Sequence, residues 1–179
     1  MMLDEITGQL VVPTARLVLR PIRASDAGLL ELYAGDARVA RGTTTIPHPL
    51  PPGAAQAFVE RAHAPGRTED IWVMDGSATG LSELLGVIGL ERMDRAQSEV
   101  GYWVAPAFWN IGIASVAVEA MVAANPHQAR TLFGSVFQDN PASARVLIHA
   151  GFEYIGDAEA YSVARGTTVP TWTYIRRLA

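Results

Sequence analysis

Cysteine and lysine are both absent from this sequence of 179 residues, so all 14 of its basic residues are arginines. Without cysteine there is no disulfide framework, no thiolate metal ligand and no cysteine nucleophile that could carry an acyl group. Without lysine there is no Schiff-base chemistry and no phosphate-loop lysine. These absences exclude several enzyme classes before any motif is considered.

The charge pattern and the hydrophobic runs exclude further classes. The net charge is −4, and the longest basic cluster is Arg176-Arg177, which argues against a nucleic-acid partner and against a polybasic membrane anchor. The apolar runs are much shorter than the ~18 residues that a membrane-spanning helix needs. The acidic N-terminus lacks the layout of a signal peptide. We therefore expect a soluble, cytoplasmic protein without nucleic-acid or membrane partners.

The hydrophobic pattern predicts one α/β domain over residues 1–179. In the second half, strand, helix, strand, helix and strand alternate, which indicates a parallel strand pair at the centre of the sheet. The expected strands span residues 16–22, 71–74, 84–93, 98–104, 131–138, 152–155 and 171–178. The expected helices span residues 25–35, 36–41, 53–64, 113–124 and 140–150.

The loop after the 98–104 strand has the features of an anion-binding site. Pro106 ends the strand, and Gly112-x-Ala114 opens a long apolar helix. The first N–H groups of a helix lack internal partners, and the helix dipole favours negative charge there. The alternative is an ordinary helix start, because glycine and alanine are common at such positions. The stretch is neither a dinucleotide fingerprint nor a Walker loop, because G-x-G-x-x-G and the loop lysine are both missing.

A second helix start follows the 131–138 strand. Asn140 caps it, Pro141 lies just inside it, and Gly151 stands just past its end. A helix with an ordinary cap and stop explains Asn140 and Gly151. Residues that follow a strand end in an α/β sheet usually face ligands, which makes the start of this helix a second candidate site.

Together these motifs resemble the GNAT superfamily of N-acetyltransferases, in its RimJ/RimL-like branch. The resemblance covers residues 13–178 in order and spacing. The motifs that carry it are Thr14-Ala15-Arg16-Leu17-Val18-Leu19-Arg20-Pro21, Glu99-Val100-Gly101-Tyr102-Trp103-Val104, Trp109-x-x-Gly112-x-Ala114 with Glu119-Ala120, and Asn140-x-x-Ser143-x-x-Val146 with Gly151-Phe152.

The resemblance implies an α/β (α+β) GNAT fold: a mixed, mostly antiparallel sheet of six to seven strands flanked by about four to five helices. Its central parallel pair, residues 97–104 and 131–138, would splay apart and hold acetyl-CoA as cosubstrate, with no metal. The backbone of Val104 would polarise the thioester carbonyl. The resemblance assigns pantetheine to Trp103, Val104 and Ala105, pyrophosphate to Trp109, Asn110, Ile111, Gly112, Ile113 and Ala114, and pantetheine with its sulfur to Asn140 and Ser143.

The chain departs from the family pattern at two positions. Asn110 stands where family members often have glycine, and asparagine accepts left-handed dihedral angles better than most residues. Leu147 stands where many members place a tyrosine general acid, which makes Ser143 the substitute candidate.

The implied reaction is direct attack of a primary amine on acetyl-CoA in a ternary complex, and the lack of cysteine closes the acyl-cysteine route. Glu99 is the candidate general base or ammonium anchor, and Ser143 the candidate acid. Strand alternation places Glu99, Gly101 and Trp103 on one side of the strand. A free glutamate, with a pKa of ~4.3, needs burial or a water relay to act as a base. The alternatives are an exposed strand carboxylate and an ordinary first-turn serine.

The acceptor is expected to be a protein N-terminal α-amine, because residues 24–68, which shape the acceptor cleft in this fold, carry no acidic cluster for a polycation. An α-amine, with a pKa of ~7.7–8, also needs only a weak base. A small-molecule amine, such as an antibiotic or metabolite, and a catalytically silent CoA-binding module are the alternatives. The sequence leaves the oligomeric state open, a homodimer included.

Overall fold

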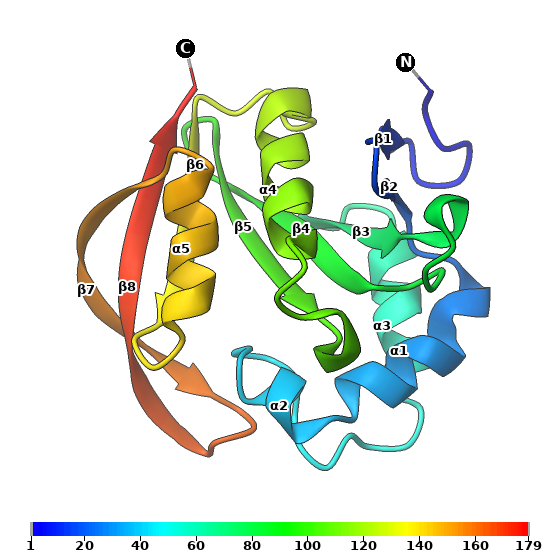
Figure 1. The fold of residues 1–179 in the computed structure, drawn as a ribbon, viewed down its shortest axis with the longest axis horizontal. Coiled ribbons are helices and arrows are strands. Elements are labelled where there is room, and N and C mark those ends of the chain that lie inside the picture. Colours follow the sequence, from blue (N-terminus) through cyan, green and yellow to red (C-terminus); the bar gives the residue numbers. More distant parts are fainter. Residues whose placement is uncertain (1, 179) are drawn as a thin grey trace.

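The computed structural model describes residues 2–178, which form one sheet with helices on both faces (Figure 1). The α-helices are α1 (Ala27–Ala34), α2 (Ala37–Ala40), α3 (Ala54–His63), α4 (Ile113–Ala124) and α5 (Pro141–His149). The strands are β1 (Val12–Pro13), β2 (Val18–Pro21), β3 (Glu69–Asp75), β4 (Gly86–Met93), β5 (Gln97–Val104), β6 (Thr131–Phe137), β7 (Glu153–Ser162) and β8 (Thr167–Arg177). Short 3₁₀ turns are η1 (Ala24–Asp26), η2 (Ser77–Thr79) and η3 (Pro106–Phe108).

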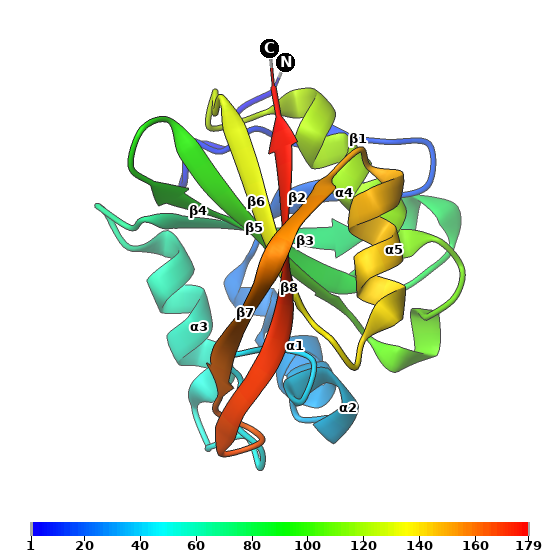
Figure 2. The ribbon, with the colours of Figure 1, turned by 90° about the vertical axis from the view of Figure 1, so that its left-hand side faces the viewer.

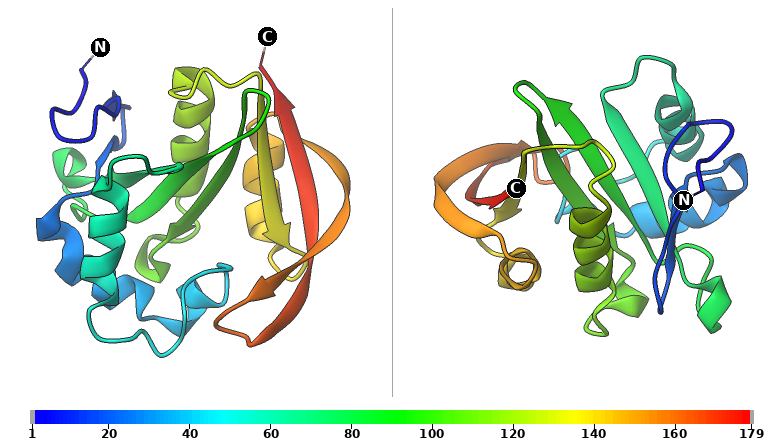
Figure 3. Two further views of the ribbon diagram at one scale, coloured as in Figure 1. Left: turned by 180° about the vertical axis from the view of Figure 1, so that it is seen from behind. Right: turned by 90° about the horizontal axis from the view of Figure 1, so that it is seen from above.

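The strand order is β1-β2-β3-β4-β5-β6-β8-β7, and β5–β6 is its parallel pair. That pair runs only from Gln97 opposite Thr131 to Val100 opposite Gly134, after which the two strands diverge (Figure 3). The structure therefore confirms the expected mixed sheet with a splayed central pair. The remaining half of β5, from Gly101 onward, borders the splay.

Two differences from the predicted strands occur at the sheet edges. The structure adds the two-residue strand β1, which pairs with β2. It also extends the predicted strand 152–155 to Ser162 at the far edge. β7 is mostly exposed and has a register shift after Tyr154, so the alternation of apolar and polar residues that reveals a half-buried strand is missing there.

The sheet separates two hydrophobic clusters. In the side view, α3 lies on one side and α4 and α5 on the other (Figure 2). Val100 and Val104 of β5 belong to the cluster with α4 and α5, whereas Trp103 packs against the cluster with α1 and α3. The predicted alternation along β5 is therefore confirmed. No helix within residues 2–178 combines the length and apolar character needed to cross a bilayer.

A buried ion cluster fixes the first helix against the sheet. Arg20 of β2 donates two hydrogen bonds to the Asp26 carboxylate, at 2.8 and 2.9 Å, and one to the Asp75 carboxylate at 2.7 Å. The Arg20 and Asp26 side chains are 5% and 2% exposed. Burial alone would lower the pKa of Arg20, but the hydrogen bonds that it donates to Asp26 and Asp75 outweigh burial and raise that pKa. Arg20, which the sequence placed on a half-buried strand, is thus buried and paired with two carboxylates.

Candidate active site

The end of β5 presents a backbone donor to the splay. The Ala105 N–H donates to the Leu85 carbonyl at 2.8 Å, on the β4 side of the strand. Successive N–H groups of a strand point to opposite sides, so the Val104 N–H points away from β4, beyond the last β5–β6 pair at Val100. Three residues were predicted to bind pantetheine through their backbone. Of these, Val104 points its N–H into the gap, whereas the N–H of Ala105 is already hydrogen-bonded to Leu85 within the sheet.

The loop that leads into α4 is tied back to β5. The indole N–H of Trp109 donates to the Val104 carbonyl at 2.7 Å, and the Arg38 guanidinium lies 5.9 Å from the centre of the Trp109 ring. Asn110 takes a φ of 63° and Gly112 a φ of 81°. Both values are left-handed, so Asn110 adopts the dihedral expected of a residue that replaces glycine.

Gly112 stands at the start of α4, which makes its first-turn N–H groups available to an anion. Ile113 is buried and anchors the helix, while Ala114 is only partly buried. Arg16 adds a positive charge that the sequence analysis did not assign to the site. Its Nη2 donates to the Ile111 carbonyl at 2.6 Å, and a Cβ on Gly112 would lie 3.0 Å from its Nη1. Arg16 is far from the loop in sequence, and no local signal links the two.

The opposite wall of the splay is the start of α5. The Asn140 side chain caps the helix by accepting from the Ser143 N–H at 3.2 Å, so its oxygen is engaged within the protein. The Ser143 hydroxyl lies 2.9 Å from the Tyr102 phenol oxygen. Leu147 is fully buried, and a Cβ on Gly134 would lie 2.7 Å from it. Position 147 is therefore a core position, and the hydroxyls at the splay come from Ser143 and Tyr102.

A cavity of about 340 Å³ opens on the α3 side of the splay. Trp103 and Tyr102 form part of its wall, and Phe58 of α3 and residues 42–46 of the loop between α2 and α3 cover it. The 24–68 segment, which was expected to shape the acceptor cleft, therefore contributes to the wall of this cavity. Glu99 also lines this cavity, so the predicted base lies beside the gap between β5 and β6.

Three glutamates form a row across the floor of this cavity. Glu69 of β3 is paired with Glu91 of β4, and Glu91 is paired with Glu99 of β5. Like charges directly opposite each other on neighbouring strands destabilise a sheet. Glu99 is an exposed residue of this open cleft, and partial desolvation there still raises its pKa, which the charge of Glu91 raises further. Desolvation likewise raises the pKa of Glu69, with Glu91 and Glu99 adding to it.

Sequence patterns alone do not reveal this carboxylate row. Residues 24–68 contain no acidic cluster, whereas the row comes from three strands and is assembled by their register. Only Glu99 belonged to a recognised motif. The cleft is therefore more acidic than the segment 24–68 suggested.

Arg165 links two segments whose residues line the cavity. From the β7–β8 turn it donates to the Arg41 carbonyl at 2.9 and 3.0 Å, pairs with the Asp139 carboxylate, and lies 4.8 Å from the centre of the Phe137 ring. It thereby connects the loop after α2 to the end of β6. Residues of both segments contribute to the cavity wall, so the contacts of Arg165 hold these two parts of the wall together.

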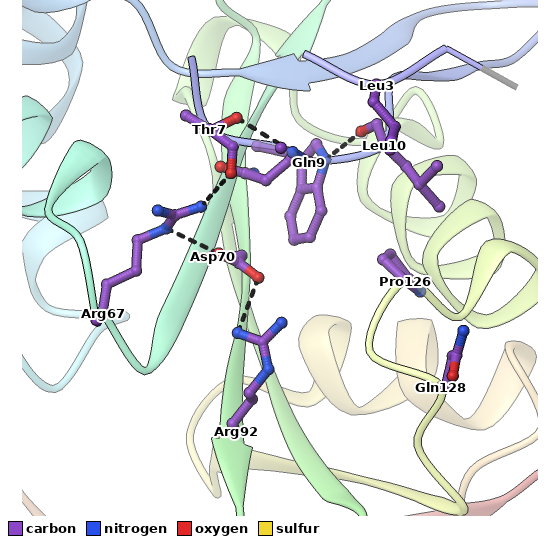
Figure 4. A pocket seen from close by; sticks show the side chains of 12 residues that line it. Leu3, Thr7, Gln9, Leu10, Arg67, Asp70, Arg92, Pro126 and Gln128 are labelled. Carbon is purple, nitrogen blue, oxygen red and sulfur yellow. Dashed lines mark hydrogen bonds and ion pairs between the residues drawn. The ribbon is translucent and has the colours of Figure 1, made fainter. Parts of the chain in front are cut away.

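A second cavity, of about 390 Å³, lies under the N-terminal segment and contains none of the predicted site residues (Figure 4). Asp70 is its central charge, and it contacts Arg67 at 2.8 Å, Arg92 at 3.1 Å and His127 at 2.8 Å. His127 also lies 2.8 Å from the Ser98 hydroxyl. This serine, histidine and aspartate series resembles a nucleophilic triad, but Ser98 is 1% exposed and cannot reach a substrate.

Electrostatics fix the charge of Asp70. Burial alone would raise its pKa, but the hydrogen bond with His127 and the charges of Arg92 and Arg67 outweigh burial and lower that pKa. Across residues 2–178, no group of three or more His, Asp or Glu side chains has the arrangement of a metal site. The two cavities therefore differ: one is an internally paired charge network and the other an open acidic cleft at the splay.

Comparison with known proteins identifies the family. Residues 16–153 match the family model described as the acetyltransferase (GNAT) domain. This match covers well over half of the chain, so the protein belongs to the GNAT acetyltransferase family. Membership confirms the predicted enzyme class, and with the sheet topology it confirms the predicted fold.

The relatives are more distant in sequence than in structure. The uncharacterized N-acetyltransferase YoaA of Bacillus subtilis (strain 168) is 31% identical over 96 residues, which are 51% of this chain and 54% of YoaA. The match thus spans about half the length of that relative.

Among solved structures, RimL, a ribosomal L7/L12 alpha-N-protein acetyltransferase in complex with coenzyme A, has a TM-score of 0.80 at 18% identity, over 94% of this chain and 98% of its own. Spermidine N-acetyltransferase from Vibrio cholerae, in complex with CoA and spermine, has a TM-score of 0.73 at 14% identity, over 90% and 96% of the two chains. At these identities the likeness concerns the fold.

Proposed function

We propose that the protein is an acetyl-CoA-dependent N-acetyltransferase that moves acetyl to a primary amine by direct attack in a ternary complex. The observation that carries this proposal is the gap between β5 and β6. The Val104 N–H points into it from one side, Ser143 stands at the other, and Glu99 opens on the cavity behind it. A thioester, an attacking amine and a leaving sulfur each have a chemical partner there.

The α4 side of the gap suits the cosubstrate. The pyrophosphate would bind the backbone N–H groups from Trp109 to Ala114, where Gly112 allows close approach and Arg16 adds a positive charge. The Val104 N–H would donate to the thioester oxygen as negative charge develops on it. Acetyl-CoA supplies the acetyl group, and the chain itself binds, orients and polarises it.

The α3 side suits the amine. A protonated acceptor would be attracted by the Glu99 carboxylate and would lose its proton to Glu99, directly or through water. The raised pKa of Glu99 makes this carboxylate a stronger base than a free glutamate. The nitrogen then bonds to the acetyl carbon, the carbon–sulfur bond breaks, and Ser143 stabilises the leaving thiolate.

For the acceptor, we propose a protein N-terminal α-amine, in keeping with the RimJ/RimL-like pattern of motifs and with a likeness in fold to RimL. The carboxylate row favours a second candidate, a small amine with additional positive charges, because Glu69 and Glu91 offer partners beyond the reacting nitrogen. The solved spermidine N-acetyltransferase shares the fold. A cytoplasmic location stays a prediction, and a homodimer is one of the oligomeric states that the sequence leaves open.

The experiment is a thiol-release assay with acetyl-CoA and a panel of N-terminal peptides, polyamines and antibiotics. The protein contributes no thiol background, because it has no cysteine. We expect CoA release that depends on one class of amine, with mass spectrometry showing an added acetyl group. Thermal stabilisation by CoA without turnover of any amine would instead indicate a silent CoA-binding module.

A further inference from the structure

Tyr102 and Ser143 form a hydroxyl pair across the splay. The Tyr102 oxygen lies 2.9 Å from the Ser143 carbonyl oxygen and 2.9 Å from its Oγ. A carbonyl only accepts, so the single phenol proton goes to that carbonyl, and the serine hydroxyl proton completes the other contact. The Ser143 proton is therefore directed at Tyr102 and is not available to a ligand in the gap.

The geometry points to a role for Tyr102 in the reaction, and this inference rests on the proposed function. We propose that Tyr102 is a positioning residue that controls the direction of the Ser143 proton. When the phenol turns its proton from the Ser143 carbonyl to Oγ, the Ser143 proton is freed to hydrogen-bond the sulfur that leaves the acetyl group. Both atoms keep their own protons throughout, so the exchange redirects hydrogen bonds and transfers no charge.

Three features of the surroundings support this exchange. Tyr102 lies on β5 beyond the last β5–β6 pair, so its ring spans the gap where the sheet no longer holds the strands together. Ser143 is fixed at the start of α5 by the Asn140 cap. Burial raises the pKa of Tyr102 to about 12, although the Ser143 hydrogen bond opposes this, so the phenol keeps its proton at neutral pH.

The test is a double-mutant cycle with Tyr102→Phe and Ser143→Ala. Phenylalanine keeps the ring that packs in the core and removes only the hydroxyl. We expect Tyr102→Phe to lower kcat about tenfold, because Oγ then lacks the phenol hydrogen bond that it accepts while its own proton bonds the leaving sulfur. The KM for acetyl-CoA should change little. The double variant should be no slower than Ser143→Ala, because the tyrosine acts through the serine.

The matched control is Tyr154→Phe, which removes a phenol that bonds Asp157 at 2.6 Å on the exposed edge strand and should leave kcat unchanged. Wild-type kcat in Tyr102→Phe, or additive losses in the double variant, would overturn the inference while leaving the proposed function standing. Absence of thiol release by the wild type with every amine would overturn both.

Discussion

The indole nitrogen of Trp109 lies 2.7 Å from the carbonyl oxygen of Val104, the residue whose own N–H points into the splay. This hydrogen bond thus connects two parts of the site: the strand end that would polarise the thioester and the loop that would bind the pyrophosphate. Because the hydrogen bond fixes the loop to the strand, the distance between the two binding groups is set before any ligand arrives. This preorganisation reduces the ordering cost of binding an extended cosubstrate.

Trp109→Phe tests this connection. The variant keeps an aromatic ring under Arg38 and loses the donor to Val104. We expect the Kd for acetyl-CoA to rise about fivefold, since one hydrogen bond contributes about 1 kcal/mol. Isothermal titration calorimetry measures the change. An unchanged Kd would show that the loop holds its position without this bond.

Gly112→Val should abolish detectable acetyl-CoA binding. Gly112 has a φ of 81°, and a Cβ there would meet Arg16 at 3.0 Å, so the side chain would strain the backbone and displace the arginine. Gly80→Val is the matched control, because Gly80 has a φ of 80° but open space around its Cβ position. Equal loss of binding in both variants would attribute the effect to general instability.

Glu99→Gln should lower kcat about a hundredfold with little effect on acetyl-CoA affinity, because the amide can neither accept a proton nor attract an ammonium. Glu91→Gln is the control, because it removes one negative charge from the same cavity and leaves the Glu99 carboxylate in place. Wild-type rates in Glu99→Gln would remove Glu99 from the mechanism.

The pH profile follows from the raised pKa of Glu99. The carboxylate form is the base, so kcat/KM for the acceptor should fall as the pH drops through that raised pKa. Glu91→Gln removes a repelling charge and should shift the acid limb of the profile to lower pH. A profile whose acid limb ignores Glu91→Gln would assign that limb to another group.

Asp70→Asn should destabilise the protein by about 3 kcal/mol, because it leaves His127 and two arginines facing a neutral group. The pKa of Asp70 is lower in the folded than in the unfolded protein, so its contribution is present above the unfolded value of ~3.9 and is lost as the pH falls through the folded value. Urea unfolding at pH 7 and at acidic pH measures both effects.

Asp36→Asn is the control for that prediction. Asp36 forms an ion pair with Arg38 at the exposed surface, where such pairs contribute little, and asparagine still caps α2. Its urea midpoint should stay near the wild-type value. A midpoint for Asp70→Asn that matches this control would contradict a stabilising role for the buried network.

The sequence predicted best where the signal was local. The alternation along residues 98–104 placed Trp103 opposite Val100 and Val104, and these side chains pack into the two different hydrophobic clusters. Asn110 of the 109–114 loop takes the left-handed dihedral angle that its replacement of glycine predicted. Such features depend on backbone preferences and a two-residue period, which a chain carries in its own order.

By itself the sequence determined which reactions the chain cannot perform, because it has no cysteine and no lysine. It also determined the family, the strand–loop–helix motif that opens α4 and the capped start of α5. Only the tertiary structure decided which side chains share a space: Glu69 beside Glu91 and Glu99, Tyr102 against Ser143, Arg16 against Ile111. The physical reason is that strand register and helix packing set these contacts. Both depend on the burial of the whole sheet rather than on neighbours in the chain.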